Sequence, residues 1–301
     1  LPRCEWGRIE DFFERLEPLR GQLPSWQGEL YLEYHRGVQT THGDFKAVFR
    51  GAERALQVWE AANALNCRGP VATNPWRRVI FCQFHDAIPG SSIREVYEEL
   101  IPELEQIIAD CGKEAERAFG AGRRSAFFNP LALRQTVEHK GKLIDLEPLG
   151  CVAKTAGRVS ADAVRVSKSS LGNSRLKARF NAAGEISSLV VDGRKLDLSE
   201  PGNQMWIYPD HPDAYPAWDI DRGTLGNGRR VKGRAETAIE QTDDTRAVLA
   251  FARPLTEKSR VVTRYILEAE SSVLKIEWEL DWQDPEMLLK SVFPTGYNGK
   301  M

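Results

Sequence analysis

The sequence predicts an α+β fold of several domains, in which a three-helix bundle precedes an antiparallel β-sandwich. The main observation is a change in the spacing of apolar residues near residue 120. Before this point they recur at helical intervals, and after it short β-rich runs alternate with turn-forming residues. A chain of 301 residues also allows two or three domains, at about 100–200 residues each.

The helical domain is predicted at residues 43–120. Its first helix has apolar positions at the i, i+3, i+4, i+7 spacing of one helix face. They are Phe45, Val48, Phe49, Ala52, Leu56 and Trp59. A second helix is expected from about Asn74 to His85, and a third opens with the capping-box spacing Ser92-x-x-Glu95. Short connections between three such helices favour a bundle.

The β-sandwich domain is predicted at residues 126–301, with its C-terminal part truncated. Short strand-like runs lie between turn signals, which is typical of an antiparallel sandwich. In "SVLKIEWELDW", Leu274, Ile276, Trp278 and Leu280 alternate with mostly charged residues. We therefore expect this run to be a strand with one buried face.

Residues 1–42 form a third piece. The stretch "GELYLEYHRGVQTTHG" alternates, so that Glu29, Tyr31, Glu33 and His35 share one face of an expected strand. About forty residues are too few for an independent domain. Because the sequence also starts with Leu1, we expect it to be a piece of a longer protein.

Composition excludes several classes of partner. A formal net charge of −2 gives no basic surface for nucleic acid or an anionic membrane. The five cysteines are widely spaced without a C-x-x-C pair, which predicts reduced and mostly buried thiols. No apolar run reaches the ~18–20 residues needed to span a bilayer, and no secretion leader opens the sequence. These features favour a cytoplasmic location.

The pair His85-Asp86 stands at the expected end of the second helix, before a Pro-Gly break. The macrodipole favours a histidine there, so a structural role for His85 is the simpler interpretation. A carboxylate at that end is mildly unfavourable, and such local conflicts often mark function. Imidazole suits Zn²⁺, but a catalytic zinc usually takes three protein ligands, and no HExxH motif is present.

The segment "WRRVIFCQFHDAIPGSSIREVYEEL" closely resembles a segment of the glycoside hydrolase family 38 α-mannosidases, with its Gln-x-His-Asp-x-x-x-Gly core. Three further stretches are similar to family segments in the same order: "GELYLEYHRGVQTTHG", "FFNPLALRQTVE" and "PAWDID". The resemblance covers nearly the whole chain. It implies that residues 1–42 are the tail end of a catalytic α/β domain.

The resemblance also implies roles for single residues. In the family, a catalytic zinc is held by a His and an Asp near the start of the protein, by the nucleophilic Asp and by the His of the helical motif. His85 would accordingly be a Zn²⁺ ligand, and Asp86 would bind hydroxyls of the α-mannoside substrate. The implied activity is retaining, zinc-dependent hydrolysis of terminal α-mannosides of glycans or mannosyl conjugates.

The sequence departs from the family in lacking the early His-x-Asp motif and any assignable nucleophile. A retaining glycosidase needs two carboxyl groups about 5–5.5 Å apart. This chain alone is therefore expected to be inactive and to hold zinc poorly. Glu33 is the candidate acid/base, weighed against an ordinary charged residue on a strand, and His35 on the same face is a candidate substrate contact.

The alternative is a non-catalytic carbohydrate-binding or scaffold module. In that interpretation Trp206, Tyr208, Tyr215 and Trp218 either pack in the core or stack on sugars, with the core favoured. A surface that normally meets the catalytic domain would be exposed in this chain, with Phe84 as one member. Exposed apolar patches favour self-association, so we expect a homo-oligomer.

Overall fold

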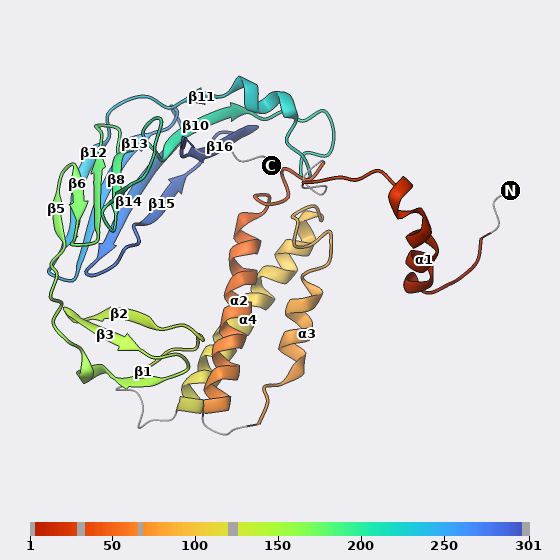
Figure 1. Ribbon diagram of the computed structural model, residues 1–301, viewed down its shortest axis with the longest axis horizontal. Coiled ribbons are helices and arrows are strands. Elements are labelled where there is room, and N and C mark those ends of the chain that lie inside the picture. Colours follow the sequence, from red (N-terminus) through yellow and green to blue (C-terminus); the bar gives the residue numbers. More distant parts are fainter. Residues whose placement is uncertain (1–3, 29–33, 66–68, 120–125, 297–301) are drawn as a thin grey trace.

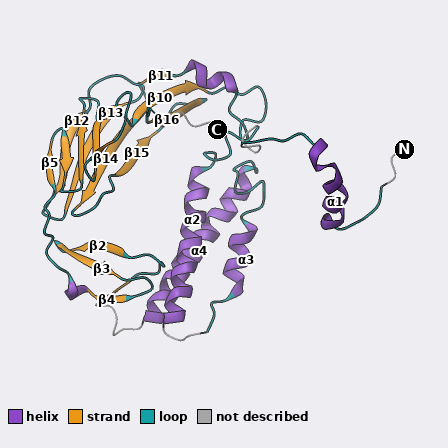
Figure 2. Cartoon of the chain, viewed as in Figure 1, coloured by secondary structure: helices purple, strands orange, loops and turns teal. Residues whose placement is uncertain are grey.

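The structure is a computed structural model that describes residues 4–28, 34–65, 69–119 and 126–296. Helices occupy the first part of the chain and antiparallel sheets the rest, so the predicted α+β class is confirmed (Figures 1 and 2). The helical elements are α1 (Ile9–Leu16), η1 (Glu17–Gln22), α2 (Gly43–Leu65), α3 (Thr73–Phe81), α4 (Arg94–Phe119), η3 (Lys154–Ala156) and η4 (Arg222–Asn227).

The strands follow one another from residue 126 onward. They are β1 (Ala126–Phe128), β2 (Gln135–His139), β3 (Lys142–Leu146), β4 (Cys151–Ala153), β5 (Arg165–Ser167), β6 (Ser170–Gly172), β7 (Leu176–Phe180), β8 (Ile186–Val191), β9 (Arg194–Lys195), β10 (Gln204–Pro209), β11 (Arg229–Arg230), β12 (Glu236–Thr242), β13 (Arg246–Pro254), β14 (Arg260–Glu268), β15 (Lys275–Asp281) and β16 (Met287–Val292).

Helices α2, α3 and α4 lie side by side and share one apolar core (Figure 1). The predicted apolar face of the first helix is the buried one, since Phe45, Ala52 and Leu56 have no exposed surface. Leu104 of α4 is equally buried and packs in the same cluster. Because burial of a large aliphatic side chain contributes about 1.5–3 kcal/mol, this shared core accounts for much of the stability of the helical part.

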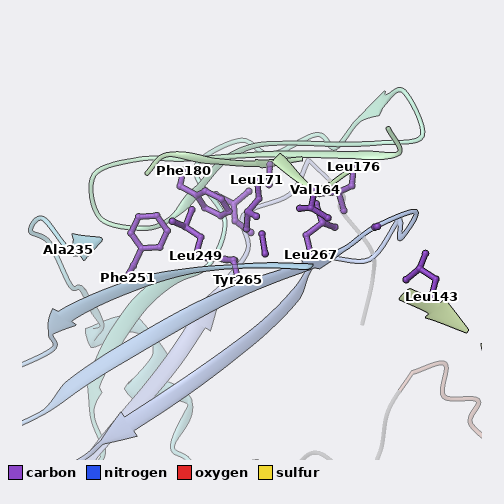
Figure 3. Close-up of a cluster of buried hydrophobic side chains, with 14 residues drawn as sticks. Leu143, Val164, Leu171, Leu176, Phe180, Ala235, Leu249, Phe251, Tyr265 and Leu267 are labelled. Atoms are coloured by element: carbon purple, nitrogen blue, oxygen red, sulfur yellow. The ribbon is translucent and has the colours of Figure 1, made fainter. Parts of the chain in front are cut away.

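Most of the β region is built around a second core, between two facing sheets (Figure 3). One sheet has the strand order β5-β6-β7-β8-β9, and the other has β12-β13-β14-β15. Leu171, Leu176 and Phe180 of the first sheet face Leu249 and Tyr265 of the second. Strands β10, β11 and β16 form a further sheet, while β1 pairs with β4 and β2 with β3.

The alternation predicted for β15 is only partly correct. Ile276 and the preceding Leu274 pack against the core, as expected. Trp278 and Leu280, in contrast, remain 46% and 45% exposed. Both residues lie on β15, which is the last strand of its sheet within the described residues.

The N-terminal piece is only partly described. Helix α1 has no buried residue and lies apart from the sheets and the other helices (Figure 1). Most of the strand expected at residues 29–35 lies outside the described residues, so that strand stays a prediction. Residues 34–42 form turns, and Tyr34 has a φ of 61°, which ends any extended backbone at that point. The domain limits at residues 42, 120 and 126 stay predictions.

The described cysteines are free, in line with the prediction of reduced thiols. Cys82 and Cys111 are buried, but Cys4 and Cys151 are exposed, so the expectation of mostly buried thiols holds for only two of these four. Burial raises the pKa of the Cys111 thiol to about 11, which keeps it protonated and unreactive at neutral pH. Among the described helices, none is both long and apolar enough to cross a membrane.

Candidate functional site

Three segments that are distant in the sequence meet at one end of α2 and α3: residues 34–42, 84–92 and 215–221. The Gly37 amide donates a hydrogen bond of 2.9 Å to the Trp218 carbonyl, and the Thr41 hydroxyl oxygen lies 3.1 Å from the Ala217 carbonyl oxygen. The Lys46 ammonium donates to the Pro89 carbonyl at 3.0 Å. In Figure 1 the loop that follows β10 reaches over to this end of the helices.

The close approach of these segments depends on two glycines. Gly90 has a φ of +95°, and a Cβ atom there would lie 2.7 Å from the Thr41 carbonyl oxygen. At Gly37 a Cβ would lie 3.2 Å from the Trp218 carbonyl carbon. A side chain at Gly90 would therefore be both strained and sterically blocked, because backbone atoms cannot move aside.

The His85-Asp86 pair lies in a turn, and the expectation that it ends the second helix is wrong. Helix α3 ends at Phe81, and the chain then turns through hydrogen bonds such as Ala87 N–H to the Phe84 carbonyl at 2.9 Å. The helix macrodipole therefore does not disfavour Asp86 at this position, because the dipole acts within the last helical turn.

Both side chains of the pair project into solvent. The side chain of His85 is 75% exposed and that of Asp86 is 44% exposed, and 3.7 Å separates His85 Nε2 from Asp86 Oδ2. The ring of Phe84 lies beside the imidazole, with 4.2 Å between ring centroids. An exposed imidazole and an exposed carboxylate are available to a metal ion and to sugar hydroxyls, respectively.

The backbone of this turn is held by side chains from the start of α4. The Ser92 hydroxyl donates to the Asp86 carbonyl at 2.8 Å, and the Tyr97 hydroxyl lies 3.3 Å from the same oxygen. Helix α4 begins only at Arg94, so the predicted capping box at Ser92 is wrong. Its hydroxyl is used on the turn instead of on a free helix amide.

An ion pair that the sequence did not suggest joins the N-terminal segment to the β region. Arg36 Nη1 lies 2.9 Å from Asp219 Oδ1 and donates to the Ile220 carbonyl at 2.9 Å. The two charged side chains are only 16% and 11% exposed. The sole signal in the sequence is the "PAWDID" motif, whose partner lies 183 residues away.

The other candidate residues fall in different places. His35 contacts Trp218 edge to face, with ring centroids 5.3 Å apart. Glu33 lies outside the described residues. Within residues 4–28, 34–65, 69–119 and 126–296, no three or more His, Cys, Asp or Glu side chains gather as a metal would need.

The four aromatic residues considered for the core have different environments. Tyr208 is buried, at 8% exposure, and stacks on the partly buried Trp206 at 6.3 Å. Tyr215 is 68% exposed, which contradicts a core position, and Trp218 is half-buried at the junction. Core packing is therefore correct for Tyr208 but not for Tyr215.

Comparison with known proteins gives consistent matches along the chain. Residues 33–121 match the model of the α-mannosidase middle domain, and residues 171–301 match that of the glycosyl hydrolases family 38 C-terminal domain. Human α-mannosidase 2C1 is 26% identical over 98% of this chain, and the α-mannosidase of Saccharomyces cerevisiae is 23% identical over the same share. Dictyostelium discoideum α-mannosidase G is 36% identical over 37% of the chain and 11% of its own length.

The fold agrees with these matches. The crystal structure of an α-mannosidase from Enterococcus faecalis V583 superposes with a TM-score of 0.67 over 95% of this chain and 47% of that one, at 12% identity. The chain spans about a third of the human and yeast relatives, namely 32% and 30% of their lengths. Because both matched models and these relatives describe one enzyme family, the chain belongs to the glycoside hydrolase family 38 α-mannosidases.

Proposed function

We propose that the protein containing this chain is a retaining, zinc-dependent α-mannosidase that hydrolyses terminal α-mannosides of glycans or mannosyl conjugates. The proposal is supported by the two consecutive family matches and by relatives that are themselves called α-mannosidases. The structural observation that supports this function is the His85-Asp86 turn, where both side chains are exposed at a junction of three segments.

In this proposal Asp86 binds the substrate. An ionised carboxylate accepts hydrogen bonds only, and sugar hydroxyls are donors that can use its two oxygens. The Asp86 backbone is fixed by Ser92 and Tyr97, so its carboxylate does not have to be ordered entirely by the substrate. His35, beside Trp218, is a second candidate contact at the same junction.

The zinc ion fits this chain only in part. The exposed imidazole of His85 has the chemistry of a zinc ligand, but a catalytic zinc usually needs three protein ligands. The described residues include no such group of ligands. We infer that this chain by itself binds zinc weakly and is inactive, and that His85 supplies one ligand among several in the active enzyme.

The finer architecture belongs to the same proposal. We interpret α2, α3 and α4 as a three-helix bundle and the facing sheets as a β-sandwich, following the domain order implied by the family resemblance. Cytoplasmic location and self-association through exposed apolar residues such as Phe84 remain parts of this proposal.

The direct test is hydrolysis of an aryl α-mannoside by the full-length protein that contains this chain. Asp86→Asn should lower kcat/KM by about 10–100-fold, the effect of losing a hydrogen bond to a charged group. Asp110→Asn is the matched control, because Asp110 is an exposed carboxylate on α4 paired with Lys113. Hydrolysis that releases the inverted anomer, or equal effects of both substitutions, would contradict the proposal.

The acid/base candidate Glu33 has its own test. Glu33→Gln in the same protein should slow substrates with poor leaving groups far more than activated aryl mannosides, because only the former need protonation. Equal losses on both substrates, or none on either, would leave Glu33 as a surface residue.

A non-catalytic carbohydrate-binding module is the second candidate function. It is favoured by one observation, the exposed Tyr215 in the same loop as the half-buried Trp218. Aromatic faces of this kind can stack on sugar rings. Mannoside binding that Tyr215→Ala abolishes, in a full-length protein without hydrolytic activity, would identify this function instead.

A further inference from the structure

Tyr97, in the first turn of α4, lies under the His85-Asp86 turn. Its side chain is buried, with 3% exposure. A buried tyrosine hydroxyl usually has polar partners, and this one does. The hydroxyl oxygen lies 3.3 Å from the Asp86 carbonyl and 3.2 Å from the Ala87 carbonyl, and it accepts the Ser92 amide at 3.1 Å. One hydroxyl thus contacts three backbone groups, two of them in the turn.

The phenolic group suits this arrangement chemically. It has one proton, which it can donate to the Asp86 or the Ala87 carbonyl, and lone pairs that accept the Ser92 N–H. The Ser92 hydroxyl adds a separate 2.8 Å bond to the Asp86 carbonyl. A phenylalanine would fill the same space but would leave these buried backbone groups without this partner.

The ring itself is fixed from the side of α2. His42 stacks on it, with ring centroids 3.9 Å apart and an interplanar angle of 17°. Phe45 contacts it edge to face at 5.2 Å. Because these neighbours belong to the segment that precedes and begins α2, the position of the Tyr97 hydroxyl is set by the packing of α2 against α4.

The exposed side chains of the turn are packed less firmly than Tyr97, since the imidazole of His85 lies against the ring of Phe84, which is itself 52% exposed. The side chain of His85 is 75% exposed and that of Asp86 is 44% exposed, so their directions depend on the backbone conformation of the turn. A site that must present two groups in fixed geometry needs residues behind it that hold the backbone.

We propose that Tyr97 is a positioning residue, which fixes the backbone of the His85-Asp86 turn through its hydroxyl and thereby sets the directions of both side chains. This inference rests on the proposed function for its catalytic consequence. Tyr97 touches neither substrate nor metal, and it acts through the Asp86 and Ala87 carbonyl groups. Ser92 assists it from the same helix end.

The first arm of the test measures amide hydrogen exchange in the 301-residue chain. Tyr97→Phe should accelerate exchange at the Ala87 and Gly90 amides by about tenfold, the effect of losing one buried hydrogen bond. The matched control is Tyr265→Phe. Tyr265 is also fully buried, and its hydroxyl makes bonds of 2.6 Å to Gly184 and Asn203 in the β region. The control should leave the amides of the turn unchanged.

The second arm measures catalysis in the full-length protein that contains this chain. At equal zinc content, Tyr97→Phe should lower kcat/KM for an aryl α-mannoside by about tenfold, while Tyr265→Phe should leave it unchanged. If Tyr97→Phe does not fold, Ser92→Ala replaces it, since this substitution removes only the 2.8 Å bond to Asp86. Ser92→Thr, which keeps a hydroxyl, should restore the wild-type values.

Three outcomes would overturn the inference. They are wild-type exchange at the turn in Tyr97→Phe, equal acceleration by Tyr265→Phe, and accelerated exchange with an unchanged kcat/KM. Failure of the proposed function is distinguishable, because the wild-type protein would then show no mannoside hydrolysis. In that case the amide exchange of Tyr97→Phe, compared with that of Ser92→Ala, would still show whether the Tyr97 hydroxyl holds the backbone of the turn.

Discussion

Replacing Arg36 by methionine should weaken the junction between residues 34–42 and the loop at 215–221. Methionine keeps an apolar stem of similar length but removes the charge and the bonds to Asp219 and Ile220, each 2.9 Å long. The Asp219 carboxylate would then stay largely buried without its cation, because its side chain is only 11% exposed.

The size of the effect follows from this burial. Removing one partner of a buried ion pair costs about 3–5 kcal/mol, since the remaining charge has lost its solvation. Exposed pairs contribute only about 0.2–1 kcal/mol. The two side chains are 16% and 11% exposed, so the stability lost in Arg36→Met should lie at the lower end of the buried range, at about 3 kcal/mol. This corresponds to about a hundredfold change in the local opening equilibrium.

Amide exchange at Gly37 is the most direct assay, because this N–H bonds to the Trp218 carbonyl across the junction. Its exchange should become about a hundredfold faster in Arg36→Met. The double variant Arg36→Met/Asp219→Leu should recover most of the loss, since an apolar pair needs no compensation for a buried charge.

A matched surface control is Arg117→Met, at the end of α4. Arg117 pairs with Glu114 one turn away, and their side chains are 70% and 37% exposed. Its loss should stay below about 0.5 kcal/mol. A stability loss in Arg36→Met no larger than in Arg117→Met would contradict a stabilising buried ion pair, and so would a double variant less stable than Arg36→Met.

Three further predictions concern the helical core, the acid limb of stability and the metal. Leu104→Ala should lower the free energy of unfolding by about 2–5 kcal/mol in urea denaturation, because Leu104 is fully buried and a cavity would remain. A loss below about 1 kcal/mol would mean that the neighbouring side chains close the cavity. The hydrogen bond from Arg158 lowers the pKa of Glu270 to about 2. The stability that this pair contributes is therefore present above the ordinary pKa of 4.5 and is lost as the pH falls from there towards 2. Arg158→Gln should flatten this part of the profile of stability against pH, and an unchanged profile would argue against the pair. His85→Ala should remove zinc and most activity from the full-length protein, as measured by metal analysis and mannoside hydrolysis. A site shared with other ligands would be contradicted if this chain alone bound zinc tightly and one-to-one and His85→Ala abolished that binding.

Features that depend on the local spacing of residues could be predicted from the sequence. The period of Phe45, Ala52 and Leu56 located helix α2 and its buried face, because a helix brings every third or fourth residue to one side. The His85-Asp86 motif could likewise be selected from neighbouring residues alone, and its resemblance to the family segment agrees with the later matches.

Features that depend on contacts between distant residues could be seen only in the folded chain. Helix α3 ends at Phe81 rather than His85, and the Ser92 hydroxyl bonds to the turn instead of capping α4. Neither follows from local preference, because a hydroxyl that suits a helix cap suits a nearby carbonyl equally well. Strand β15 shows the same limit, since its alternation could not reveal that it would be the last strand of its sheet within the described residues and that Trp278 would stay 46% exposed.

The junction that forms the candidate site is the clearest case. Arg36 and Asp219 are 183 residues apart, and each looks like an ordinary surface charge in the sequence. They become a buried pair where the backbone at Gly37 approaches the backbone at Trp218 closely. Periodicity reports which face of an element is buried, but it carries no information on which other segment covers that face, so only the folded chain determined this contact.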